Sequence, residues 1–307
     1  FKGENGAKVL GFHGRGGHAI DAIGAFFETG SKKLSEKKGL VGGNKGDTFD
    51  DGVFDGVKKI TVGADEYSVT YIKIEYEKDG KSDTREHGTA RGDLKEFSVD
   101  YPNVNIIAVG GSYDHIFTYD TTLVTSLYFT LSNGRTSPKF GKTSGTDFNF
   151  KGENGAKVLG FHGRGGHAID AIGAFFETGS KKLSEKKGLV GGNKGDTFDD
   201  GVFDGVKKIT VGADEYSVTY IKIEYEKDGK SDTREHGTAR GDLKEFSVDY
   251  PNVNIIAVGG SYDHIFTYDT TLVTSLYFTL SNGRTSPKFG KTSGTDFNFK
   301  GENGAKV

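Results

Sequence analysis

The stretch Ser68-Val69-Thr70-Tyr71-Ile72-Lys73-Ile74-Glu75-Tyr76 decides the class of the fold. It is rich in β-branched and aromatic residues, the types that are enriched in β-strands. Because side chains alternate along a strand, Ile72, Ile74 and Tyr76 share one face, and a lysine and a glutamate take the other. Asp79-Gly80 then supplies the two positive φ angles of a type I′ hairpin turn. The stretch therefore predicts a half-buried strand of an antiparallel sheet.

Similar strand signals recur along the chain, whereas helical periodicity is scarce. A second hairpin signal, Asn133-Gly134, follows a run in which apolar and polar residues alternate. Short strands separated by turns are typical of all-β sandwiches, barrels and prisms. Further strands are expected at residues 57–62, 94–99, 104–109, 123–131, 147–150 and 158–161.

The composition excludes several classes of protein. The 307 residues carry a net charge of −3, so the strongly basic surface that binds nucleic acid is not expected. There is no Cys, which excludes disulfides, thiolate metal sites and cysteine nucleophiles. No apolar run approaches the roughly 20 residues of a membrane span, so no membrane partner is expected. The first residues lack the apolar stretch of a secretory signal, and a cytoplasmic or vacuolar location is expected.

A long internal repeat makes up the chain. The segment Phe1–Val9 recurs as Phe150–Val158 and again as Phe299–Val307, and the step from position 1 to position 150 sets a period of 149. The copies are identical, which favours an engineered chain, or a piece of a longer array, over a duplication that has drifted. Such a long period indicates two tandem domains rather than a solenoid, whose repeats run to about 20–50 residues.

The linker-like segments within the repeat predict the domain boundaries. Residues 29–38 are polar and charged and resemble a linker, as does their copy at residues 178–187. One complete domain is therefore expected at residues 32–179. The second is expected at residues 181–307, completed by residues 1–30 of the same chain or, through domain swapping in a homo-oligomer, of another chain.

The nine duplicated residues at the two ends compete for one strand position. These are residues 1–9 and 299–307. The copy at 1–9 is expected to take the position, because it is followed covalently by the strand that carries Asp21.

A glycine-rich loop with a single carboxylate stands out in each repeat, as Gly17-His18-Ala19-Ile20-Asp21 and Gly166-His167-Ala168-Ile169-Asp170. Glycines let a ligand approach backbone N–H groups, and one Asp can accept two hydrogen bonds from adjacent hydroxyls. This chemistry suits a neutral polyol such as a hexose. A tight turn with a solvated Asp is the alternative. A dinucleotide fingerprint at Gly14–Ala19 is disfavoured, because no βαβ unit surrounds it.

No other motif predicts catalysis, a metal site or a cofactor. The segment Gly39–Gly52 hints at a calcium loop, but it lacks the required Asp spacing and the final Glu. Neither a Gly-x-Ser-x-Gly elbow nor a P-loop occurs, so an enzyme is not expected. Arg91-Gly92-Asp93 matches an adhesion tripeptide only as three common residues. Gly110-Gly111-Ser112-Tyr113-Asp114 repeats the glycine-to-aspartate spacing, and it predicts either an additional sugar site or a plain turn.

Several motifs taken together resemble those of the jacalin-related lectins. They are Gly42-Gly43-Asn44-Lys45-Gly46 running into Phe49-Asp50-Asp51-Gly52, then Gly11-Phe12-His13-Gly14-Arg15 and the loop that ends at Asp21. Arg135–Pro138 and Phe97–Pro102 resemble, more narrowly, the myrosinase-binding branch from cruciferous plants. The resemblance extends across the whole repeat unit. It implies two domains with the β-prism I fold, in which three four-stranded sheets surround a pseudo-threefold axis.

The resemblance also implies which groups hold a sugar. Asp21 would accept hydrogen bonds from the O4 and O6 hydroxyls of a hexose. The backbone N–H groups of His18 and Ala19 would donate to O5 and O6, and that of Gly195 to O3. Gly17 would act by permitting the loop shape. The second set is Gly46 with Gly166, His167, Ala168 and Asp170, because chain order should bring the loop of Gly46 to the loop of Asp170.

A non-catalytic, multivalent lectin is the function that the resemblance implies. Galactose-binding relatives have a free N-terminal glycine, whereas this chain runs unbroken through Lys38-Gly39. The site loop carries His18 and Ala19 without a ring for stacking, and mannose or glucose is therefore favoured over galactose. Lys45 stands where the family usually has glycine and could weaken the O3 contact. Two alternatives stay open: a module that binds a glycosylated β-glucosidase such as myrosinase, and an engineered scaffold in which identical repeats serve assembly.

Overall fold

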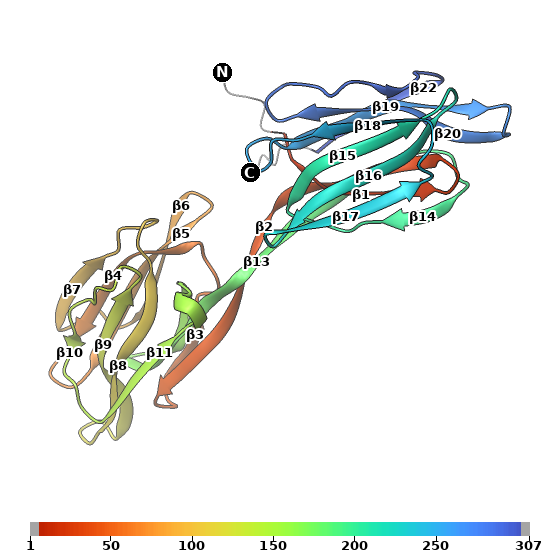
Figure 1. The fold of residues 1–307 in the computed structure, drawn as a ribbon. Helices are drawn as coiled ribbons and strands as arrows, with labels where there is room; N and C mark the ends of the chain where they lie inside the picture. Colours follow the sequence, from red (N-terminus) through yellow and green to blue (C-terminus); the bar gives the residue numbers. More distant parts are fainter. Residues whose placement is uncertain (1–5, 302–307) are drawn as a thin grey trace. The chain divides into compact units, whose positions relative to one another are not determined.

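The structure is a computed structural model that describes residues 6–301, and Figure 1 traces its strands. The described residues form 22 strands and one short 3-10 helix, η1 (Glu153–Gly155). They divide into two compact units, here called unit 1 (residues 1–32 with 182–307) and unit 2 (residues 33–181). In unit 1 the first and last segments of one chain come together. No helix of the described part is long and apolar enough to cross a membrane.

Unit 2 contains two four-stranded antiparallel sheets and four strands of a six-stranded sheet. Their strand orders are β6-β5-β4-β7, β10-β9-β8-β11 and β3-β12-β13-β2. The third sheet uses residues 169–181 of β13 and residues 33–42 of β2. The bounds are β2 (Ile20–Gly42), β3 (Asp47–Asp50), β4 (Gly56–Ala64), β5 (Val69–Lys78), β6 (Lys81–Gly88), β7 (Asp93–Ser98), β8 (Ile106–Ile116), β9 (Thr121–Leu131), β10 (Phe140–Gly141), β11 (Thr146–Lys151), β12 (Val158–Gly165) and β13 (Ile169–Gly191).

Unit 1 repeats this arrangement with the equivalent strands. Its sheets have the orders β17-β16-β15-β18, β21-β20-β19-β22 and β14-β1-β2-β13. The remaining bounds are β1 (Val9–Gly16), β14 (Asp196–Asp199), β15 (Gly205–Ala213), β16 (Val218–Lys227), β17 (Lys230–Gly237), β18 (Asp242–Ser247), β19 (Ile255–Ile265), β20 (Thr270–Leu280), β21 (Phe289–Gly290) and β22 (Thr295–Lys300).

Each sheet is organised around a central hairpin with the same irregularities. In unit 2 these hairpins are β12–β13, β4–β5 and β8–β9, and each has one register shift near its open end and one near its turn. Bulges at matching places bend the three hairpins in the same way. The three sheets are therefore related by pseudo-threefold symmetry. This is the β-prism I arrangement, and the predicted all-β fold is confirmed.

The strand predicted at residues 68–76 is β5, and its alternation is confirmed. Ile72, Ile74 and Tyr76 are only 2%, 1% and 0% exposed. They face the core that the three sheets of unit 2 enclose, and unit 1 has an equivalent core. The following turn has φ angles of 50° at Asp79 and 79° at Gly80, as a type I′ hairpin requires.

The structure describes only parts of the two duplicated end segments. Residues 1–5 and 302–307 lie outside the described residues, so the predicted competition can be followed only in part. Phe299 and Lys300 continue β22, in the place that their equivalents have in β11, while Val9 begins β1. At Phe299 and Lys300 the copy at the end of the chain holds the strand position, so the prediction that the copy at 1–9 takes it is wrong for these two residues, and the rest of the prediction lies outside the described residues.

Candidate functional site

A cavity on each unit gathers the residues that the loop motifs singled out. In unit 2 a cavity of about 430 Å³ is lined by Gly46, Gly166, His167, Ala168 and Asp170. The structure therefore brings together the two loops that lie far apart in the sequence. In unit 1 the equivalent cavity of about 540 Å³ is lined by Gly17, His18, Ala19, Asp21 and Gly195.

The turn of the β12–β13 hairpin supplies the carboxylate. We call residues 166–170 the carboxylate loop. A register shift between Arg164 and Gly165 lets the chain turn, and the N–H of Gly166 donates to the carbonyl of Ala168 at 3.0 Å. Asp170 follows as the second residue of β13 and is only 6% exposed. The hairpin thus holds a carboxylate at the floor of the cavity.

A second loop, residues 42–46 and here called the glycine loop, closes the opposite side. The N–H of Gly43 donates to the backbone carbonyl of Asp170 at 2.7 Å. Gly46 has a φ of +76°, and a Cβ placed on it would lie 2.4 Å from Asp170 Oδ1. Glycine is therefore required at position 46, both for the backbone conformation and for the close approach to the carboxylate.

The first glycine of the carboxylate loop has a different role from the one expected. Neither Gly17 nor Gly166 has a positive φ, and a Cβ on either would meet no atom within 4 Å. The expectation that these glycines permit the loop shape is therefore wrong. They instead leave open space beside the cavity, into which a ligand can approach the backbone.

Asp170 is a buried carboxylate without an ionic partner. Among the described residues, no cationic nitrogen lies within the 4.0 Å of an ion pair. Burial raises the pKa of the Asp170 carboxyl above its usual range, against the opposing effects of its own backbone and of Arg164, His167 and Lys45. The ammonium of Lys45 instead donates to the carbonyl of Asp120 at 3.0 Å. No cation neutralises the carboxylate, and the lone pairs that its own backbone N–H does not engage remain for a ligand.

Three backbone N–H groups complete the polar surface of the cavity. They belong to Gly46, His167 and Ala168, and no described residue accepts a hydrogen bond from any of them. A backbone donor without a partner is uncommon in a folded protein. The site can therefore offer three donors and one anionic acceptor to a neutral molecule that carries several oxygens.

Other lining residues come from segments that were not expected at the site. They are Arg91, Tyr119, Thr121 and Leu123. Tyr119, in the turn after β8 and outside the loop for which no stacking ring was expected, adds an aromatic residue to the lining. A signal for Arg91 was present in the sequence. Two glycines four residues apart recur at 42 and 46, at 88 and 92, and at 141 and 145, which is the internal threefold repeat of the prism.

Only one of the three corners of the prism carries a carboxylate at this place. The backbone bond that the carbonyl of Asp170 accepts has counterparts at Thr70 (2.8 Å) and Thr125 (3.0 Å). Each of these threonine hydroxyls donates to a carbonyl of its own glycine-flanked loop, at 2.8 Å and 3.1 Å. The other two corners are therefore satisfied internally and offer no acceptor equivalent to Asp170.

The segment Gly110–Asp114 does not form a turn, and the expectation of a plain turn is wrong. It lies within β8, where Gly110 pairs with Asn149 and a Cβ on Gly110 would lie 2.3 Å from the Tyr128 ring. Ser144 Oγ donates to the Asp114 carboxylate, which therefore has a partner. Spacing alone did not distinguish a strand interior from a loop.

Comparison with known proteins places these observations in a family. The Jacalin-like lectin domain matches residues 38–175 and 187–307. The chain belongs to the jacalin-like lectin family. The first matched segment contains the glycine loop, and the second contains the copy of this loop at residues 191–195. Neither segment includes the start of the chain, which completes unit 1.

Curated relatives of this jacalin-like lectin come from Arabidopsis thaliana. Myrosinase-binding protein 2 is 51% identical over 87% of this chain, and the match covers 41% of that protein. Jacalin-related lectin 32 is 40% identical over 89% of this chain and 92% of its own length. This chain therefore spans less than half of the first of these relatives.

Solved structures similar to this jacalin-like lectin each match about one unit. The mannose-binding lectin from champedak is 28% identical over 47% of this chain and 98% of its own, with a TM-score of 0.44. Artocarpin complexed with methyl-α-mannose is 26% identical over 48% of this chain and 99% of its own, with a TM-score of 0.44.

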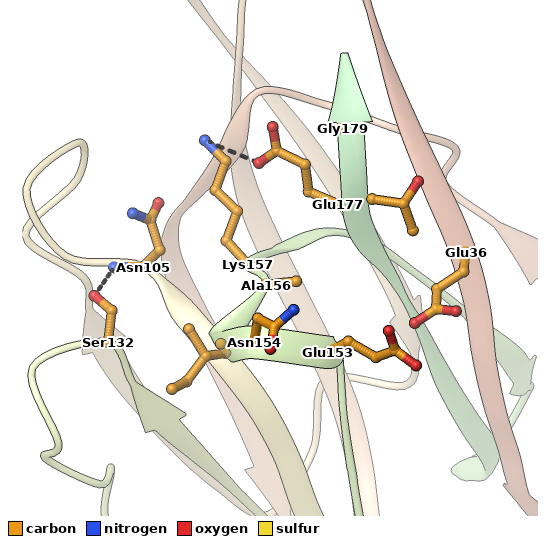
Figure 2. Close-up of a pocket in the computed structure, with 12 residues that line it drawn as sticks. Glu36, Asn105, Ser132, Glu153, Asn154, Ala156, Lys157, Glu177 and Gly179 are labelled. Carbon is orange, nitrogen blue, oxygen red and sulfur yellow. Dashed lines mark hydrogen bonds and ion pairs between the residues drawn. The ribbon is translucent and has the colours of Figure 1, made fainter. Parts of the chain in front are cut away.

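A separate hollow on unit 2 of this jacalin-like lectin contains none of the predicted site residues. It has a volume of about 570 Å³, and Figure 2 shows its polar lining, which includes Glu36 and Glu153. Lys157 Nζ lies 3.8 Å from Glu177 Oε2 across it. The described part of the chain holds no group of three His, Cys, Asp or Glu side chains placed to bind a metal.

Proposed function

We propose that each unit binds one mannose or glucose residue of a glycan, without catalysis. The observation that carries this proposal is the buried Asp170 carboxylate, which has no ionic partner among the described residues and shares one cavity with three backbone N–H groups for which no described residue is an acceptor. A carboxylate accepts hydrogen bonds from hydroxyls, and N–H groups donate to hydroxyl or ring oxygens. The set therefore suits a neutral sugar better than an anion.

The proposed arrangement of the hexose follows the family resemblance. Asp170 accepts from O4 and O6, while the N–H groups of His167 and Ala168 donate to O5 and O6. The N–H of Gly46 donates to O3. Strand β2 runs without interruption past Lys38-Gly39, so no free terminal glycine is available there for a galactose-type site. This supports mannose or glucose over galactose.

Titration of the chain with three methyl glycosides tests the proposal. A single hexose site of this kind is expected to bind with a dissociation constant of about 1 mM, or roughly −4 kcal/mol. Methyl α-mannoside and methyl α-glucoside should occupy two sites per chain in calorimetry, and methyl α-galactoside should bind about tenfold more weakly. Equal binding of the galactoside would contradict the specificity. Binding of none of the three would contradict the lectin function.

The affinity for mannose should fall in mildly acidic solution. The sugar hydroxyls donate to the ionised form of Asp170, and burial raises the pKa of this carboxyl above its usual value of 3.8. Protonation therefore removes the acceptor at a higher pH than for an ordinary aspartate. Calorimetric titrations from pH 7 to pH 4 should show progressive weakening while circular dichroism stays unchanged. A constant affinity over this range would contradict the role of the carboxylate.

A protein-interaction module is the second candidate function. It is favoured by the 51% identity to myrosinase-binding protein 2. In this case the partner is a glycosylated β-glucosidase, and the contact includes protein surface. A pull-down with myrosinase before and after enzymatic deglycosylation separates the candidates. Capture that survives deglycosylation favours the protein contact, and capture that is lost with the glycan favours the lectin.

A further inference from the structure

The loop at residues 88–92 is the pseudo-threefold counterpart of the glycine loop. Gly88 has a φ of +82°, and a Cβ on it would lie 2.2 Å from the Thr70 carbonyl, as one on Gly42 would from the Asp170 carbonyl. Gly92 has a φ of +78°, close to that of Gly46. We call residues 88–92 the bracing loop. Its corner of the prism has a threonine in place of the aspartate, so it does not form a second copy of the site.

The bracing loop makes two hydrogen bonds to the neighbouring carboxylate loop. Thr89 Oγ1 donates to the carbonyl of Gly166 at 2.9 Å, and Arg91 Nη2 donates to the carbonyl of His167 at 2.9 Å. The other terminal nitrogen of Arg91 pairs with the Asp65 carboxylate. Two consecutive carbonyls of the carboxylate loop are therefore held from the same side.

Asp65 is itself fixed by the chain that surrounds it. Its Oδ1 accepts from the backbone N–H groups of Tyr67 and Ser68, both at 2.9 Å. These bonds lower the pKa of the Asp65 carboxyl, although burial acts in the opposite direction as the largest single effect. Asp65 therefore stays ionised and holds the guanidinium of Arg91 in one orientation.

The planarity of the peptide bond links these carbonyls to the donors of the site. In a trans peptide the C=O of one residue and the N–H of the next point in opposite directions. The carbonyl of Gly166 belongs to the same peptide as the N–H of His167, and the carbonyl of His167 to the same peptide as the N–H of Ala168. Drawing both carbonyls toward the bracing loop therefore turns both N–H groups away from it. These are the N–H groups for which no described residue is an acceptor.

We propose that Thr89 and Arg91 are positioning residues, which fix the two peptide planes that present backbone N–H groups to the sugar. This proposal rests on the proposed function, since it assigns a purpose to the donors of the same site. Unit 1 has the same contacts. Thr238 Oγ1 donates to Gly17 O at 2.9 Å, and Arg240 Nη2 donates to His18 O at 3.0 Å. There the bonds join segments more than 200 residues apart in the chain.

An isosteric substitution separates positioning from packing. Thr89→Val with Thr238→Val removes the donating hydroxyl from both units at an exposed position, and Thr89→Ser with Thr238→Ser retains it. The valine pair should bind methyl α-mannoside about three- to tenfold more weakly than the wild type, the range expected for losing one neutral hydrogen bond. The serine pair should bind within about twofold of the wild type. Both variants should unfold at the same temperature as the wild type.

Nuclear magnetic resonance of the sugar-free chain provides a readout that does not depend on binding. Residual dipolar couplings of the His167 and Ala168 N–H groups report their orientation, and these couplings should change in the valine pair but not in the serine pair. Unchanged couplings in the valine pair would overturn the positioning role, whatever happens to the affinity. Wild-type affinity in the valine pair would overturn it as well.

The two proposals can fail separately. If the wild-type chain binds no hexose but the couplings change in the valine pair, the lectin function is lost and the positioning of the peptide planes stands. A second pair, Arg91→Lys with Arg240→Lys, keeps the positive charge but cannot bridge a carboxylate and a carbonyl as the guanidinium does. It should change the coupling of the Ala168 N–H most, because that peptide carries the His167 carbonyl. An unchanged Ala168 coupling would overturn the part assigned to Arg91.

Discussion

Replacing Asp170 and Asp21 together by asparagine is expected to abolish binding of mannose. Each aspartate provides the one anionic acceptor of its cavity. A hydrogen bond to a charged group contributes roughly 1.5–3 kcal/mol, so weakening two of them removes about as much as the whole −4 kcal/mol of a millimolar site. Calorimetry should therefore detect no heat of binding with methyl α-mannoside.

The single variants serve as matched controls for the double variant. Because the repeats are identical, Asp170→Asn alone should reduce the number of sites from two to one and leave the affinity of the other site unchanged. Asp21→Asn alone should do the same. Two sites remaining in either single variant would show that the carboxylate is not required.

The same variants should be more stable than the wild type. A loss of mannose binding in them would then be due to the missing carboxylate and not to unfolding. Burial raises the pKa of Asp170 and of Asp21, so the folded state disfavours their ionised forms. An acid with a raised folded pKa binds its proton more tightly when folded, and stability therefore falls as the pH rises through that pKa. Asparagine removes this penalty. Thermal unfolding should occur at a higher temperature than in the wild type at pH 7, with the difference vanishing below pH 3.8.

Local patterns predicted the all-β fold, and the family resemblance predicted the prism and the two loops that line the cavity. Alternation in β5 and the Asp79-Gly80 turn depend only on neighbours in sequence, and both are as expected. The loops of Gly46 and Asp170 could be paired because the family resemblance includes them both. The spacing of glycine and aspartate alone predicted the site less well than the family resemblance did. It did not show that Gly110 lies inside a strand, because a strand and a loop can share the same spacing of glycine and aspartate.

The residues that sequence reasoning missed are those that depend on packing between sheets. Thr89 and Arg91 contact the carboxylate loop only because the prism places one corner beside the next. Tyr119 reaches the cavity from a third sheet. No single segment carries this information, since it arises from how three hairpins are arranged around an axis. The recurring glycine pairs indicate the threefold arrangement of the hairpins. They do not indicate which of the three corners carries an aspartate.

Placing alanine at Gly46 and Gly195 should abolish mannose binding by displacing the carboxylate. The new Cβ would lie 2.4 Å from an oxygen of Asp170 or Asp21, which is closer than real contacts allow. Alanine would also have to adopt a φ of +76° or +77°, which strains an L-residue by about 1 kcal/mol. The carboxylate must then move out of the cavity, and both binding and stability should fall.

Alanine at Gly134 and Gly283 isolates the effect of the steric contact. These glycines have φ angles of +85° and +84°, so the backbone strain is similar, but a Cβ there would meet nothing within 4 Å. This control pair should lose a comparable roughly 1 kcal/mol of stability in denaturant unfolding and still bind mannose at two sites. If the Gly46 and Gly195 pair also retained both sites, the close approach of the glycine loop to the carboxylate would have no part in holding the sugar. If instead the control pair lost its binding, backbone strain far from the cavity, and not the displaced carboxylate, would explain the loss.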